Sequence, residues 1–139
     1  MYHPLTHDDQ PLDHIEWSCQ PEVAAEARDV TYGFIAGLSP APSPHTSQNL
    51  VLVVSELVTN ALRHAGAVTS LQLRADRGSL QIVVNDPSPA PPLDRTPDLT
   101  GRSGGFGWPM VQRLAEQVSV RPRAGGGKAI LAVLARRSA

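Results

Sequence analysis

The chain has 139 residues and a formal net charge of −1 at pH 7, with 12 lysines and arginines against 13 aspartates and glutamates. This length fits one domain with a single core, and the balanced charge gives no general attraction to nucleic acid or anionic lipid. A single cysteine excludes an internal disulfide and a cysteine-based zinc site. No apolar run has the length of a membrane span and the first residues lack a secretory signal, so we expect a cytoplasmic protein that binds neither nucleic acid nor membrane.

Both ends of the chain are expected to lie outside the folded domain. Residues 1–13 are polar, contain two prolines and show no periodicity, which predicts an N-terminal tail. Residues 136–139 are expected to form a short C-terminal tail. This leaves residues 14–135 as one domain.

The first half of this domain predicts a strand and two helices. Residues 14–19 alternate like a strand, and residues 21–37 have the spacing of a helix whose apolar stripe includes Val23. Residues 44–64 predict the longest helix, because Ser43 suits a cap and apolar residues then recur at helical spacing. The stripe of this helix consists of Leu50, Val53, Val54, Leu57, Val58, Ala61 and Leu62.

The second half predicts strands on either side of a long loop. Residues 70–75 and 80–85 alternate like the strands of a hairpin, and residues 87–106 are rich in proline and glycine. The remaining expected elements are a helix over 107–116 and strands over 118–121 and 128–134. This order predicts an α+β two-layer sandwich, in which helices cover one face of a mixed, mostly antiparallel sheet.

Two polar residues on the longest predicted helix have the spacing of a shared site. Glu56 and Asn60 are four residues apart, so they lie on one helix face one turn from each other. A carboxylate and an amide at this spacing can share a magnesium-phosphate site, where the amide oxygen binds the metal and the carboxylate orients a nucleophile. The solvent-facing side of a helix gives the same pattern, so the pair alone does not identify a site.

Two further features suit a nucleotide. Asp86 follows an apolar strand, and a carboxylate at the mouth of an apolar pocket accepts a hydrogen bond from the exocyclic amine of adenine, whereas guanine would place an oxygen there. An aspartate that begins a turn gives the same pattern. The glycine-rich segment 101–107 leads into a predicted helix, whose first amides and positive dipole end favour phosphate.

In this order, the three features resemble the Bergerat-fold (GHKL) superfamily of gyrase, heat-shock chaperone, histidine-kinase and mismatch-repair ATPases. Within it, the sequence is most similar to the anti-sigma-factor serine/threonine kinases of bacteria. The resemblance covers about residues 15–135 and is closest over residues 56–65, which look like the N box of that family.

The resemblance implies a role for each candidate residue. Glu56 would be the general base, Asn60 would bind magnesium and the nucleotide, and Asp86 would recognise adenine by a hydrogen bond. Residues 87–106 would form a lid over ATP. The other positions implied to bind ATP are Arg63, His64, Gly105, Phe106, Gly107, Trp108 and Lys128.

The sequence also departs from the family pattern. Ser88 and Ala90 stand where many members have glycines, and Phe106 and Trp108 replace a basic residue and a leucine. The missing basic residue bears on phosphoryl transfer more than on nucleotide binding. The two aromatic residues then either cover the nucleotide or pack in the core behind the loop.

Two functions follow from the resemblance. The first is an anti-sigma-factor kinase that uses ATP and Mg²⁺ to phosphorylate a small antagonist protein and also binds a sigma factor. The second is a non-catalytic module of the same fold, which regulates a partner by contact alone. The resemblance further suggests a homodimer.

Overall fold

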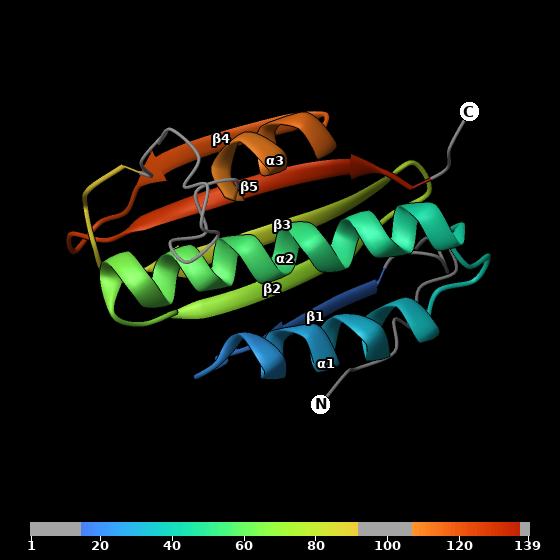
Figure 1. The fold of residues 1–139 in the computed structure, drawn as a ribbon, viewed down its shortest axis with the longest axis horizontal. Helices are drawn as coiled ribbons and strands as arrows, with labels where there is room; N and C mark the ends of the chain where they lie inside the picture. Colours follow the sequence, from blue (N-terminus) through green and yellow to red (C-terminus); the bar gives the residue numbers. More distant parts are fainter. Residues whose placement is uncertain (1–14, 92–106, 137–139) are drawn as a thin grey trace, which may run out of the picture.

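The sheet of this protein carries its helices on one face. The computed structural model describes residues 15–91 and 107–136, and in these ranges three helices lie on the same side of a five-stranded sheet (Figure 1). The elements are β1 (Ile15–Cys19), α1 (Ala24–Ala36), α2 (Pro44–Ala65), β2 (Ser70–Ala75), β3 (Ser79–Asp86), α3 (Gly107–Leu114), β4 (Gln117–Pro122) and β5 (Lys128–Ala135). The predicted two-layer α+β fold is confirmed.

The strands follow the order β1-β2-β3-β5-β4, and every pairing between the described strands is antiparallel. β3 lies at the centre, where it pairs with β2 on one side and with β5 on the other. The pairing of β3 with β5 runs over the full length of both strands, from Ser79 opposite Ala135 to Asp86 opposite Lys128. This register places the end of β3 next to the beginning of β5.

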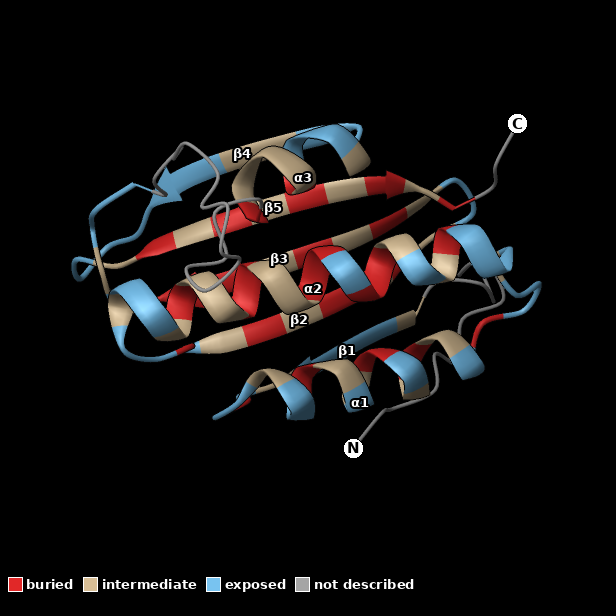
Figure 2. Ribbon diagram, in the orientation of Figure 1, coloured by how far each residue is buried: buried red, intermediate tan, exposed pale blue. Residues whose placement is uncertain are grey.

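The core fills the space between the sheet and the helices. Alternate residues of β2, β3 and β5 are buried, because successive side chains of a strand point to opposite faces (Figure 2). Six of the seven residues predicted for the stripe of α2 are buried and Leu62 is half-buried. The apolar spacing of this helix therefore identified its inner face.

α1 covers the β1 side of the sheet, but its stripe begins later than expected. Phe34 and Trp17 pack edge to face, with ring centroids 6.2 Å apart. Val23, which was expected in the stripe, is 52% exposed. It is the residue before the first helical turn and has extended backbone geometry, so its side chain does not follow the helical spacing.

α2 has a clear beginning and a clear end. The Ser43 hydroxyl accepts a hydrogen bond from the Thr46 amide at 3.1 Å, as a helix cap does. Gly66 ends the helix in the left-handed conformation, with φ 81°. The helix has 22 residues, yet no helix within the described ranges combines the length and the apolar character that crossing a bilayer requires.

The domain extends one residue beyond the expected boundary. Arg136, which was assigned to the C-terminal tail, is buried, and its guanidinium donates to the carbonyl oxygens of Asp76 at 2.6 Å and Pro40 at 3.1 Å. These carbonyls belong to two connections that are far apart in the sequence. The side chain therefore ties the end of β5 to both of them.

Substituting alanine for Gly66 should destabilise the protein by about 1–2 kcal/mol, because a Cβ disfavours the left-handed conformation. Gly78 is the matched control, since it also lies in an open turn but does not have a positive φ. Gly78→Ala should change the free energy of unfolding by less than about 0.5 kcal/mol. Urea denaturation of both variants measures the difference, and equal effects would contradict the role given to Gly66.

Candidate functional site

Three segments that carry predicted site residues meet at one end of the molecule. The last turns of α2, the end of β3 and the beginning of β5 lie at this end (Figure 1). Gly66 allows the chain to leave α2 and reach β2 within four residues, and the Thr69 amide then donates to the Asn85 carbonyl at 2.7 Å. The turn after α2 is thereby fixed beside the residue that precedes Asp86.

Glu56 lies against the first residue of α3. Its carboxylate occupies the space that a side chain at position 107 would need, because a Cβ on Gly107 would overlap Glu56 Oε2. Gly107 is itself buried, whereas the Glu56 side chain is half-buried. Glycine at position 107 therefore lets the carboxylate approach the amino end of α3.

The surroundings of Glu56 make it a stronger base than an exposed glutamate. Partial burial raises the pKa of its carboxyl above the ordinary value of 4.5, and the positive charge of Arg63 lowers it by a smaller amount. A carboxylate with a raised pKa holds a transferred proton more firmly. This property suits general base catalysis near neutral pH.

Asn60 lies one turn after Glu56 and is half-buried, while Arg63 and His64 are exposed in the last turn of the helix. Within the described residues, no group of three or more His, Cys, Asp or Glu side chains could form a metal site. A magnesium ion here would have the Asn60 amide oxygen as its protein ligand, with phosphate and water oxygens completing the shell. Mg²⁺ at nucleotide sites keeps several waters and binds substrate phosphates, so it needs few protein ligands and one amide oxygen is compatible with the ion.

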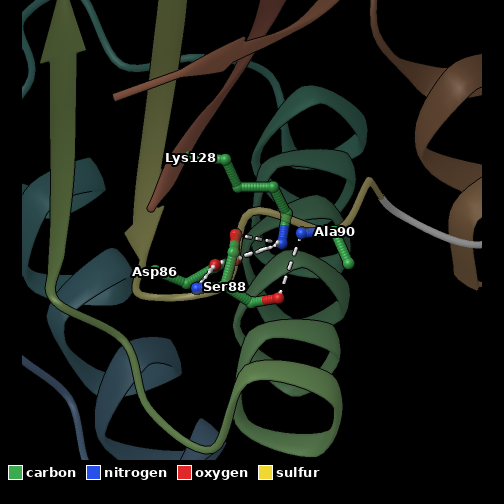
Figure 3. Close-up of polar contacts among 4 residues, drawn as sticks. All are labelled: Asp86, Ser88, Ala90 and Lys128. Carbon is green, nitrogen blue, oxygen red and sulfur yellow. Dashed lines mark hydrogen bonds and ion pairs between the residues drawn. The ribbon is translucent and has the colours of Figure 1, made fainter. Parts of the chain in front are cut away.

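Asp86 is paired with Lys128, a contact that the sequence analysis missed (Figure 3). Both residues are buried, and the Lys128 ammonium lies 2.9 Å from Oδ2 and 3.0 Å from Oδ1 of the carboxylate. They are register partners on β3 and β5, so both side chains point to the helix-covered face. Lys128 was expected to bind the nucleotide. In the structure it instead binds Asp86, the residue that was expected to recognise adenine.

Ser88 completes the surroundings of this pair. Its backbone amide donates to Asp86 Oδ1 at 2.9 Å, and its carbonyl accepts from Lys128 Nζ at 3.3 Å (Figure 3). The Ser88 hydroxyl accepts from the Ala90 amide at 3.2 Å. The two positions that depart from the family glycines therefore form a hydrogen-bonded turn next to the ion pair.

The glycine turn before β5 brings Lys128 to this place. A Cβ on Gly127 would overlap the Asp86 carbonyl oxygen, so only glycine permits this close approach to the end of β3. Gly125 and Gly126 have φ values of 97° and 106°, which glycine adopts without strain. The geometry of this turn therefore explains why it contains three consecutive glycines.

The remaining candidates belong to the loop and to its junction with α3. Gly105 and Phe106, and the lid from residue 92 onward, lie outside the described residues. Trp108 is half-buried and packs against the core. Of the two roles left open for this tryptophan, the core contact is therefore observed, and cover over a nucleotide stays a prediction.

Comparison with known families identifies the family of this domain. A family model described as a histidine kinase-like ATPase domain matches residues 18–133. The match covers most of the chain, which therefore belongs to this family of ATP-binding domains. A comparison with curated proteins finds no match.

Replacing Glu56 with glutamine should stabilise the fold at neutral pH. The raised pKa means that the folded state favours the protonated carboxyl. The associated stability is present below the ordinary value of 4.5 and is lost as pH rises through the folded pKa. Glutamine is neutral at every pH and avoids this loss.

The melting temperature of Glu56→Gln should therefore exceed that of wild type at neutral pH, and the difference should shrink toward about pH 4. Glu116→Gln is the control, because it removes the same charge from an exposed glutamate that follows α3 in the sequence. A Glu56→Gln protein that melts below wild type at neutral pH would show that the ionised carboxylate stabilises the fold.

Removing the carboxylate of Asp86 should cost about 3–5 kcal/mol of stability, because the Lys128 ammonium is then buried without its partner. The double variant Asp86→Ala/Lys128→Met removes both charges and should recover a large part of this loss. Urea denaturation of the single and double variants measures the coupling. Additive losses in the double variant would mean that the two charges do not depend on each other.

Proposed function

We propose that the chain is an ATP-dependent anti-sigma-factor serine/threonine kinase, which phosphorylates a small antagonist protein and binds a sigma factor. Family membership supports the ATP-binding part of this function. The observation that carries the kinase part is Glu56, whose carboxylate has a raised pKa and lies at the amino end of α3, one turn from Asn60. A base, a magnesium ligand and a helix amino end are among the groups that phosphoryl transfer to a hydroxyl uses.

ATP would supply the phosphoryl group that is transferred to a serine or threonine hydroxyl of the antagonist. Glu56 would accept the proton of this hydroxyl as its oxygen bonds to phosphorus and ADP leaves. Asn60 would hold the magnesium ion, and the first amides of α3 would donate to phosphate, since they have no partner within the helix. The positive charge of Arg63 opposes the effect of burial on the pKa of Glu56, so it favours the ionised carboxylate that acts as the base.

The ion pair at Asp86 favours a second function. Lys128 engages the carboxylate that would otherwise be available to adenine, and the adjoining turn contains Pro87 and Pro89, which have no amide donors. Both features support a module that regulates its partner by contact, with weak nucleotide binding or none. Nucleotide titration and a phosphotransfer assay separate this module from the kinase.

Wild-type protein should bind ATP and ADP, and Asn60→Ala should remove the magnesium dependence of this binding while leaving the protein folded. Isothermal titration with and without magnesium measures both effects. Thr59→Ala is the control, because it replaces the half-buried neighbour of Asn60 on the same helix. The absence of heat with either nucleotide at millimolar concentration, with magnesium present, would exclude the nucleotide-binding role.

Glu56→Ala should lower phosphotransfer by about 10²–10⁴-fold with little change in nucleotide affinity, as expected for a general base. Labelled ATP, magnesium and candidate antagonist proteins provide the assay. The wild-type rate should rise with pH as Glu56 loses its proton, with a midpoint above 4.5. A full rate in Glu56→Ala would place the base elsewhere, and nucleotide binding without any transfer by wild type would favour the contact module.

A further inference from the structure

The outer side of the helix layer carries two exposed apolar side chains near Glu56. Among the described residues, the large apolar side chains that lie in a helix and remain exposed are Leu52 of α2, at 40%, and Tyr32 of α1, at 59%. Leu52 is also the one exposed residue of α2 between Gln48 and Arg63. Covering apolar surface of this kind favours association with a partner.

The contact between α1 and α2 shows that these two side chains lie at the same level. The helices pack side by side and run in opposite directions (Figure 1), and Arg28 Nη1 donates to Ser55 Oγ at 3.2 Å. Tyr32 comes one turn after Arg28, and Leu52 comes about one turn before Ser55. In antiparallel helices both steps lead in the same direction. Tyr32 and Leu52 therefore form one patch across the boundary between the helices.

This Tyr32–Leu52 patch lies beside the proposed base, on the side away from the nucleotide. Leu52 is four residues before Glu56 and Asn60 is four residues after it, so the three follow one another along one side of α2. Each step is about 6 Å along the helix axis. In the proposed mechanism, magnesium and phosphate lie at Asn60, and the rest of the nucleotide extends toward the end of the molecule that contains Asp86.

Phosphoryl transfer fixes the side from which the acceptor approaches. The attacking and leaving oxygens lie roughly in line on opposite sides of the phosphorus. ADP leaves on the Asn60 side of Glu56, so the acceptor hydroxyl comes from the Leu52 side. It must also lie within hydrogen-bond distance of the Glu56 carboxylate, which takes its proton. The chain on either side of the acceptor hydroxyl is thereby brought to the Tyr32–Leu52 patch.

We propose that Leu52 and Tyr32 bind the acceptor segment of the antagonist protein and select a serine or threonine that has an apolar neighbour. This inference rests on the proposed function, because it takes Glu56 as the base. An extended segment advances about 3.3 Å per residue, so the step of about 6 Å from Glu56 to Leu52 corresponds to about two residues. The apolar side chain is therefore expected about two positions from the acceptor. A segment with only polar or charged neighbours would leave the patch uncovered.

The antagonist protein that accepts phosphate in the transfer assay is the probe for this inference. Leu52→Gln makes the side chain polar at similar size and should raise KM for the antagonist by about threefold to tenfold, since only the exposed part of Leu52 is newly covered. Tyr32→Ser should raise KM by a similar factor. Neither variant should change kcat or the affinity for ATP, because the lost contact is equally strong in the ground state and the transition state.

Two control variants distinguish docking from a general effect on the fold. Leu52→Met keeps an apolar side chain and should retain the wild-type KM. Val23→Gln removes an apolar side chain that is 52% exposed at the amino end of α1, away from the patch, and should also leave KM unchanged. Circular dichroism checks that each variant is folded. If Leu52→Gln does not fold, Tyr32→Ser decides the question.

Mass spectrometry of the phosphorylated antagonist tests the acceptor class. An apolar residue should lie about two positions from the phosphorylated serine or threonine. An acceptor with only polar or charged neighbours would overturn the inference, and so would an unchanged KM in both patch variants or an equal rise in Val23→Gln. Each of these results leaves the kinase function intact. Failure of the wild-type chain to transfer phosphate to any candidate antagonist would overturn both proposals.

Discussion

The pairing of β3 with β5 is the constraint on which the rest of the structure depends. It joins the hairpin of β2 and β3 to the hairpin of β4 and β5, and its register decides which residues of both strands face the helices. A shift of one residue would move the whole apolar set of β5 to the other face of the sheet. The same register places Asp86 opposite Lys128, so the core and the candidate site are fixed by one set of backbone hydrogen bonds.

Local patterns in the sequence were sufficient to predict the elements but not their contacts. The apolar stripe of α2 and the alternation of β2 and β3 identified these elements and their inner faces, because both signals depend on neighbouring residues. The sequence also indicated Glu56, Asn60 and Asp86 as candidate site residues. It did not reveal the partner of Asp86, since Lys128 follows a glycine turn 42 residues later and only the strand register brings the two together.

Other features depended on tertiary contacts that no local pattern records. The raised pKa of Glu56 arises from burial near α3, where glycine at position 107 leaves space for the carboxylate. Arg136 looked like part of a polar tail because its acceptors are backbone carbonyls of Pro40 and Asp76, and carbonyls are present at every position of every sequence. Ser88 looked like a departure from a glycine pattern, yet its backbone holds both members of the ion pair.

The place of β5 in the sheet has a consequence for synthesis on the ribosome. β5 lies between β3 and β4, although it follows both in the chain. Until it emerges, the nascent chain exposes an unpaired edge of β3 and lacks the surface on which β4 packs, and such open edges favour aggregation. Because Arg136 then joins connections made about 60 and 96 residues earlier, this domain completes its folding only after its last strand has been released.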